Sequence, residues 1–440
     1  MKKRFWKVKL GAIGSQDEST EGTVPRVSEP TSASEQVSRE GNRALALVST
    51  AVFLTSSTWF SGTAAAPDLI HSWGLTSTES AWLTISVQLG FIAGTFLYAF
   101  FNLADVFNPR RVFFVSALLG AAFNAAFALI ADGLPTAFAF RALTGVTLAG
   151  IYPVGMKLVA SWFRSQLGWR LGILVGALTL GTAFPYLIQT LGSQFDWRTL
   201  AGTASILALA GGCLVLLALS DGPFLKARAP FDARMLWRVF AYLPFRRTAF
   251  GYFGHMWELY AFWSMIIFYL GARLQGDDLS TGTGLSLLAF LIIATGSLGC
   301  ILGGWVSRRI GEKKVAQFSL MVSCILCLSS GVLYELNSGL LVALLLIWGF
   351  FVVSDSPQFS ALAVRFCPSQ YTGTALTVQN GLGFAITVIS IQLTPWMAEI
   401  LGWRWALTFL GVGPLIGLYF LQQLPENGDR NGQAGSDKEV

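Results

Sequence analysis

The chain has 440 residues, of which 53% are hydrophobic and only 12% are charged, and its net charge is +6. A soluble globular protein carries roughly 25% charged residues, so too little charge is present to cover a soluble surface of this size. The composition argues against a soluble enzyme, a nucleic-acid binder and a disordered scaffold.

The amino-terminal segment is polar and basic, and it lacks an apolar run long enough to span a membrane. Residues 1–42 begin with five basic side chains and continue with a stretch rich in Ser, Glu, Thr and Gly, which predicts a disordered cytoplasmic tail. Because no apolar region followed by a small-residue cleavage site occurs in it, we expect no cleavable signal peptide.

Twelve apolar runs follow, each close to the roughly 20 residues that a membrane-spanning helix needs. They are too long and continuous for the strands of a membrane barrel. We expect six-helix bundles at 43–220 and 248–422, a cytoplasmic linker at 221–247 and a cytoplasmic tail at 423–440. The predicted spans are 44–66, 80–101, 112–131, 136–163, 171–191, 199–220, 248–271, 284–306, 315–334, 340–366, 374–397 and 405–421.

Lys and Arg residues gather in alternate connecting segments. They cluster in the amino-terminal tail, in the central linker and after the second, fourth and eighth spans, whereas the intervening segments hold only Arg198, Arg273 and Arg404. By the positive-inside rule, both termini lie in the cytoplasm. We expect a multi-pass protein of a bacterial cytoplasmic (inner) membrane.

The two halves of the chain match at an almost constant offset. Gly145 and Pro153 in the fourth span align with Gly349 and Pro357 in the tenth. The segment 101–111 aligns in the same way with 304–314, and two Trp-Arg pairs also match, at 197–198 and 403–404. This repeat predicts a duplicated six-helix unit with a site between the copies near the membrane midplane, an arrangement typical of transporters.

The repeated residues resemble motifs of the major facilitator superfamily. The loop motif G-x-L-A-D-R-x-G-R-K is matched in part by Leu103, Ala104 and Asp105 with Arg110 and Arg111. Its second copy is richer in glycine and basic residues, with Gly304, Arg309, Gly311, Lys313 and Lys314.

Two further motifs extend the resemblance. R-x-x-x-G in helix 4 matches Arg141 and Gly145, and the helix 5 motif typical of antiporters is matched in part by Gly172, Gly181 and Pro185. More loosely, the chain resembles bacterial nitrate/nitrite- or cyanate-permease-like members of the family.

The resemblance implies an all-α membrane protein with twelve transmembrane helices in two pseudo-symmetric six-helix bundles. Helices 1, 4, 7 and 10 would surround a central cavity, and inner loops would clamp the inward gate through charged groups and a helix end. The alternative is that these loops are solvated and only set topology. The candidate gating residues are Asp105, Arg110, Arg111, Arg308 and Arg309.

Charged side chains within the spans are few, and a charge in the bilayer core normally faces an internal cavity. Arg141 in the fourth span is the candidate anchor for an anionic substrate. The alternative is a structural arginine whose donors are satisfied by helix ends and carbonyl groups.

Three ionisable residues are candidates for proton coupling. His255 and Glu258 are three residues apart and share one face of the seventh span. Asp355 precedes Ser356 and Pro357 in the tenth span, where the proline predicts irregular backbone beside the cavity. The alternatives are a polar helix contact with a neutral Glu258, or a Glu258–Arg141 pair that a substrate anion would compete with.

Other polar and aromatic residues are candidates for contacting the substrate, namely Trp59, Tyr152, Gln379 and Asn380. The alternative for each is a helix-to-helix contact.

The chain lacks a Gly-x-x-x-x-Gly-Lys-Ser/Thr loop, so no ATP-driven pump is indicated. Apolar packing explains Cys324 and Cys327 better than a metal or redox site, and no catalytic cluster can be argued. We therefore expect no enzyme, cofactor, metal or nucleic-acid partner. We expect a monomeric secondary transporter in the lipid bilayer, moving a small organic or inorganic anion with protons. The alternatives are a proton-driven exporter of amphipathic compounds and a non-transporting membrane sensor.

Overall fold

Helices make up nearly all of the chain that the computed structural model describes, and no strand occurs there. The described residues are 32–163, 167–192, 196–225, 239–277, 281–367 and 372–425. The first half contains α1 (Ser32–Ser56), α2 (Ser61–Ala64), α3 (Ala66–Trp73), α4 (Ser77–Ser80), α5 (Trp82–Phe100), α6 (Leu103–Val106), α7 (Pro109–Ile130), α8 (Leu134–Leu148), α9 (Tyr152–Ala160), α10 (Leu167–Leu191) and α11 (Trp197–Ala218). The second half contains α13 (Leu243–Arg273), α14 (Gly282–Ile310), α15 (Glu312–Leu328), α16 (Ser330–Leu333), α17 (Ser338–Ser354), α18 (Ser356–Phe366), α19 (Thr372–Leu401), the 3₁₀ helix η3 (Thr408–Gly411) and α20 (Val412–Gln422).

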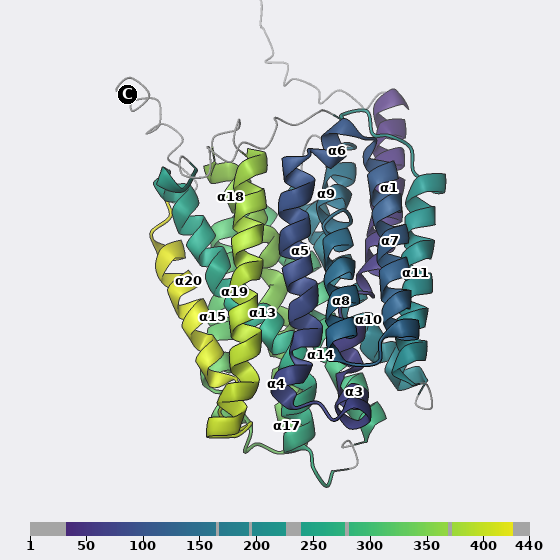
Figure 1. The fold of residues 1–440 in the computed structure, drawn as a ribbon. Helices are drawn as coiled ribbons and strands as arrows, with labels where there is room; N and C mark the ends of the chain where they lie inside the picture. Colours follow the sequence, from purple (N-terminus) through teal and green to yellow (C-terminus); the bar gives the residue numbers. More distant parts are fainter. Residues whose placement is uncertain are drawn as a thin grey trace, which may run out of the picture.

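The long helices run roughly side by side in one bundle (Figure 1). The start of α1 and the last residues of α20 lie at the same end, which we call the terminal end; α3, α4 and the start of α17 lie at the opposite end. At the terminal end, Arg247 donates to the Gln423 carbonyl at 2.7 Å and Lys313 to the Leu424 carbonyl at 2.6 Å. These bonds fix the end of α20 against the helices beside it.

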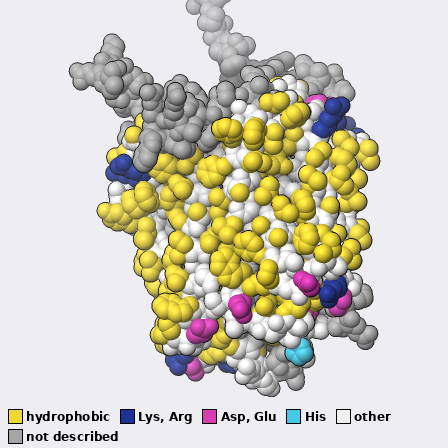
Figure 2. Space-filling model, viewed as in Figure 1, with side chains coloured by type: hydrophobic (Ala, Val, Ile, Leu, Met, Phe, Trp, Pro, Cys, Tyr) yellow, Lys and Arg dark blue, Asp and Glu magenta, His cyan; other side chains and the backbone are white. Residues whose placement is uncertain are grey.

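Every predicted span coincides with a long helix or a broken pair of helices. Eight helical segments of the described chain are long and apolar enough to cross a membrane by length and composition. The other four predicted spans correspond to α1, α13, α15 with α16, and η3 with α20. The outward surface agrees, because hydrophobic side chains form a broad band with charged groups towards its two ends (Figure 2). Exposed leucines such as Leu129 and Leu217 belong to this apolar surface.

Two helices begin earlier in the chain than the predicted boundaries. The helix α1 begins at Ser32 and not after residue 42, because the polar residues before the apolar run continue its helical turns. Likewise α13 begins at Leu243, within the predicted linker, with Pro244 in its first turn, where a missing N–H costs nothing. The predictions for residues 1–31, 226–238 and 426–440 lie outside the described residues.

The two halves repeat the same close helix contact. A Cβ atom on Gly145 of α8 would lie 2.1 Å from the Val87 carbonyl oxygen of α5, and one on Gly349 of α17 would lie 1.8 Å from the Ile292 carbonyl oxygen of α14. Only glycine lets these backbones approach so closely. The contact therefore supports the predicted duplication.

The helix breaks also repeat. α8 ends at Leu148 and α9 resumes at Tyr152 with Pro153 in its first turn, while α17 ends at Ser354 and α18 resumes at Ser356 with Pro357. Proline lacks the N–H that would continue the ladder. Irregular backbone thus occurs at the two places where the prolines predict it.

The first span breaks without proline, between α1 and α2. Hydroxyl groups of Thr55, Ser57 and Thr58 donate to backbone carbonyls three or four residues earlier. Such bonds compete with the helical ladder. A run of Ser and Thr therefore weakens the helix here, and the carbonyls it frees need other donors.

Replacing Asp196 with alanine is expected to destabilise the protein by about 1 kcal/mol at neutral pH, since this residue caps α11. Its Oδ1 accepts from the Thr199 N–H at 2.9 Å and from the Thr199 hydroxyl at 2.8 Å. The backbone bond lowers the pKa of Asp196, so its stabilising effect exists above the usual carboxyl pKa and is lost as pH falls through the lowered value. Thermal unfolding at several pH values measures this, with Asp196→Asn, which keeps an acceptor, as the control. Equal stability of the alanine variant and the parent at neutral pH would contradict it.

Candidate transport cavity

A cavity of about 40 Å³ lies between the two halves. Helices of both halves contribute to it, and no charged side chain lines it among the described residues. The lining residues are Trp59, Phe91, Tyr152, Val175, Leu178, Tyr252, Met256, Leu259, Tyr260, Trp263, Val353, Ser356, Ser360, Asn380 and Phe384.

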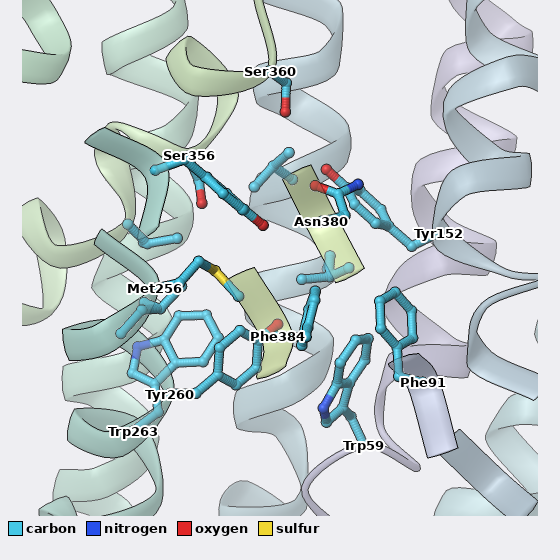
Figure 3. Close-up of a pocket in the computed structure, with 15 residues that line it drawn as sticks. Trp59, Phe91, Tyr152, Met256, Tyr260, Trp263, Ser356, Ser360, Asn380 and Phe384 are labelled. Carbon is cyan, nitrogen blue, oxygen red and sulfur yellow. The ribbon is translucent and has the colours of Figure 1, made fainter. Parts of the chain in front are cut away.

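Aromatic rings gather on the side of this cavity that faces the opposite end of the bundle (Figure 3). The Trp59 ring lies 5.8 Å from Tyr260 and 5.6 Å from Phe384, and the Phe91 and Phe384 rings lie 4.4 Å apart. Trp59 and Phe91 belong to the first half, whereas Tyr260 and Phe384 belong to the second. We call these four residues the aromatic layer. It joins the halves through ring contacts, each stabilising by about 1 kcal/mol beyond simple burial.

Polar groups occupy the side of the cavity nearer the terminal end. They are Tyr152 at the start of α9, Ser356 and Ser360 on the first turns of α18, and Asn380 on α19 (Figure 3). The helix breaks at Pro153 and Pro357 place Tyr152 and Ser356 here. A molecule in the cavity would meet rings on one side and hydroxyl or amide groups on the other.

Behind Ser356 lies a buried pair of ionisable side chains. His255 Nδ1 lies 2.9 Å from Asp355 Oδ1, and His255 Nε2 lies 2.8 Å from the Ser356 hydroxyl oxygen. The side chains of His255 and Asp355 are each 1% exposed. Close polar contacts thus connect Asp355 to the cavity wall, first as an ion-pair contact with His255 and then as a hydrogen bond between His255 and Ser356.

Glu258 lies elsewhere, although it shares a helix with His255. Its Oε1 accepts from the Ser323 hydroxyl at 2.5 Å and from the Trp348 indole N–H at 2.6 Å. These partners on α15 and α17 hold it within the second half. The hypothesis of a Glu258–Arg141 pair is wrong, because both side chains are buried against other partners.

Arg141 holds the broken first span together. Its Nη1 donates to the Thr58 carbonyl at 2.7 Å, to Asn124 Oδ1 at 2.9 Å and to the Ser61 hydroxyl at 3.0 Å, and its Nη2 donates to the Trp59 carbonyl. The side chain is 0% exposed and does not line the cavity. This placement corrects the expected anchor in the cavity wall and fits the alternative of a structural arginine.

The other predicted binding residues divide between the cavity wall and the helix packing. Trp59, Tyr152 and Asn380 line the cavity, whereas Gln379 is fully buried and does not. The lining residues that sequence reasoning missed include Ser356, Ser360, Met256 and the remaining three members of the aromatic layer. Ser356 had a usable signal, since it lies next to Asp355 and before Pro357.

The predicted gating residues lie near the terminal end. Arg110 pairs with Asp221 at 2.8 Å within the first half, and Arg111 is exposed. The Arg308 guanidinium lies 5.3 Å from the centre of the Trp169 ring and so joins the halves, whereas Arg309 lies over Trp305 of its own helix. Asp105 belongs to α6, but its side chain lies outside the described part of the structure.

Two hydrogen bonds cross between the halves towards the opposite end. The Thr78 hydroxyl donates to Glu399 Oε1 at 3.0 Å, and the Ser286 hydroxyl donates to Gln189 Oε1 at 2.8 Å. A second cavity of about 390 Å³ lies between the halves there, with Asp68 and Gln189 in its wall. The aromatic layer lies on the side of the central cavity that faces this end.

The sequence model described as the Major Facilitator Superfamily matches residues 47–391 and 248–439. The chain is 28% identical over 134 residues to the "Probable galactarate/D-glucarate transporter GudP" of Escherichia coli, covering 29% of this chain and 30% of that protein. It is 35% identical over 130 residues to the "Niacin transporter NiaP" of Acinetobacter baylyi, covering 27% and 28%. The match thus spans less than a third of each relative's length.

Solved structures share the fold over most of the chain. The proton:xylose symporter XylE, bound to 6-bromo-6-deoxy-D-glucose, aligns with a TM-score of 0.72 at 12% identity, covering 88% of this chain and 96% of that one. The human organic anion transporter MFSD10 aligns with a TM-score of 0.66 at 16% identity, covering 87% and 99%. At such low identity the likeness shows the fold alone.

Proposed function

Because this chain belongs to the major facilitator superfamily, we propose that it is a secondary active transporter that moves a small organic acid together with protons by alternating access. One observation carries the proposal. A cavity built by both halves is lined by rings and hydroxyl groups, and a buried His255–Asp355 pair reaches it through Ser356. Rocking of the halves would expose such a site to each side of the membrane in turn.

The organic-acid assignment rests on the relatives and on the cavity. The matched curated proteins are named for galactarate/D-glucarate and niacin transport, and one structural neighbour is named an organic anion transporter. No lysine or arginine lines the described cavity. We propose that a proton held by His255 and Asp355 compensates the substrate's negative charge, so that acid and proton cross together. The proposed setting is a monomer in a bacterial inner membrane with the terminal end in the cytoplasm.

Transport by purified protein in proteoliposomes tests this proposal. Labelled niacin, D-glucarate and galactarate would be offered with and without a pH gradient. We expect accumulation of at least one above its equilibrium concentration only when the side from which it enters is acidic. The proposal would be abandoned if none of the three accumulated under either direction of the gradient.

The Asp355→Asn variant is expected to lose gradient-driven accumulation but to keep exchange of labelled for unlabelled substrate across the membrane. Asparagine can still contact His255, but it carries no charge to stabilise a protonated imidazole. Parallel assays of accumulation and of exchange measure the two effects.

Glu258→Gln is the matched control, since it changes a buried carboxyl group that does not line the cavity. We expect it to keep gradient-driven accumulation. The opposite pattern, with accumulation lost in Glu258→Gln and kept in Asp355→Asn, would move proton coupling to Glu258.

A second candidate function is export of amphipathic compounds. The uncharged, ring-lined cavity wall favours it. Greater retention of hydrophobic cations in cells that lack the protein, combined with no uptake of organic acids by proteoliposomes, would support export over the first proposal.

A further inference from the structure

Ser356 belongs to two environments at once. Its hydroxyl oxygen lies 2.8 Å from His255 Nε2, and the same residue lines the central cavity (Figure 3). Neither His255 nor Asp355 lines that cavity. A hydrogen-bonded path from His255 to a bound molecule therefore runs through this hydroxyl group.

The neighbouring carboxylate fixes which imidazole nitrogen keeps its proton. An ionised carboxylate only accepts hydrogen bonds, and Asp355 Oδ1 lies 2.9 Å from His255 Nδ1, so the contact favours a proton on that nitrogen over two facing lone pairs. Neutral His255 then has an unprotonated Nε2, which accepts from the Ser356 hydroxyl. Protonated His255 carries a second proton on Nε2, which must donate to the Ser356 oxygen instead.

We infer that Ser356 is a proton-controlled polarity switch in the cavity wall, a conclusion that rests on the proposed function and deepens it. A hydroxyl group has one proton. When His255 is neutral, that proton points to Nε2 and the cavity meets only lone pairs. When His255 is protonated, the Ser356 proton is free to donate into the cavity.

Other ionisable groups surround this chain of bonds. Tyr252 faces His255 from the same helix, with its ring centre 5.9 Å away, and Tyr152 of α9 lies near Tyr252. Cys300 of α14 faces Asp355 and donates to the Val353 carbonyl, while Glu258 is held by Ser323 and Trp348. Tyr252 also lines the cavity but meets His255 only through its ring, so among the described residues Ser356 is the cavity-lining residue that hydrogen-bonds to His255.

The switch assigns a substrate preference. Protonation would favour a molecule that presents an acceptor without a donor, such as a carboxylate, and would disfavour one that presents a donor to this position. A carboxylate would bind after His255 gains its proton. The affinity for the carboxylate would then fall once His255 lost that proton. Coupling would then need no charged side chain in the cavity wall.

The first experiment measures the tautomer of His255 directly. The chain has two histidines, so His71→Gln leaves His255 as the single ¹⁵N-histidine signal in the full-length protein. We expect neutral His255 to carry its proton on Nδ1, and we expect Asp355→Asn to shift the proton towards Nε2. A neutral form protonated on Nε2 would overturn the switch, because Ser356 would then accept in both states, and it would leave the transport proposal standing.

The second experiment measures binding of labelled niacin to purified protein at two pH values, about 6 and about 8.5. We expect affinity about tenfold higher at the lower pH in the parent protein, the value of one hydrogen bond to a charged group. Ser356→Ala should lose this difference. Ser360→Ala, on the same helix face and without a bond to His255, should change the affinity equally at both pH values.

The two proposals fail in different ways. A difference between pH values that survives in Ser356→Ala would overturn the switch. If the parent protein bound no niacin at either pH, the proposed substrate class would lose its support, and the tautomer measurement would still decide whether the switch exists.

Discussion

Gly349→Ala is expected to leave little folded protein. The new Cβ atom would lie 1.8 Å from the Ile292 carbonyl oxygen and 2.8 Å from its carbonyl carbon, both backbone atoms of α14. Backbone cannot rotate away as a flexible side chain can, so α14 and α17 would have to separate. Such overpacking costs about 3 kcal/mol or more when a close-packed interior cannot yield. The yield of monodisperse protein and its unfolding temperature measure the effect.

Gly145→Ala should show the same defect in the other half, since its Cβ would lie 2.1 Å from the Val87 carbonyl oxygen. Gly202→Ala on α11 is the matched control. No atom lies within 4 Å of its new Cβ, and alanine favours helix over glycine by about 1 kcal/mol. If Gly349→Ala were as stable as Gly202→Ala, the close approach of α14 and α17 would be wrong.

Arg141→Met is expected to cause the second large loss of stability. Methionine fills much of the volume but donates nothing, so the Thr58 and Trp59 carbonyls would be left buried without their donor. Each unsatisfied group costs about 1–3 kcal/mol. Asn124 and Ser61 would also lose a partner. We therefore expect a much lower unfolding temperature in detergent, together with loss of transport.

Arg141→Lys separates charge from geometry. Lysine keeps the positive charge, but a single ammonium group cannot reproduce the planar fork that reaches four acceptors. We expect it to be almost as unstable as Arg141→Met. A fully stable lysine variant with weakened anion transport would instead restore the substrate anchor that the sequence suggested.

The spans were predictable because lipid leaves little choice of structure. A spanning segment needs a long apolar run, so the twelve runs identified the helices, and Pro153 and Pro357 identified two breaks. The break before Ser61 was harder, because it depends on hydroxyl groups that bond to their own backbone and on an arginine 80 residues further along the chain. The hydropathy of the sequence does not predict such a contact between distant residues.

The cavity was predictable only where polarity marked it. Trp59, Tyr152 and Asn380 were identified as unusual in apolar runs, and so were His255 and Asp355. The rest of the aromatic layer was missed, because a phenylalanine that faces a cavity has the same hydropathy as one that faces lipid. Gln379 was misplaced since adjacent helical residues point about 100° apart, and a polar pair does not tell which member faces inward.

The small central cavity has a consequence for how tightly any molecule can bind. Pockets for small ligands typically enclose about 300 Å³ or more, whereas this one holds about 40 Å³. A ligand can enter only when the rings of Trp59 and Tyr260 move apart. Its measured affinity is therefore lowered by the small fraction of protein molecules in that open conformation. Replacing Phe384 with a smaller residue would remove its ring contacts in the aromatic layer, and we expect it to strengthen ligand uptake, because the open conformation would be more populated.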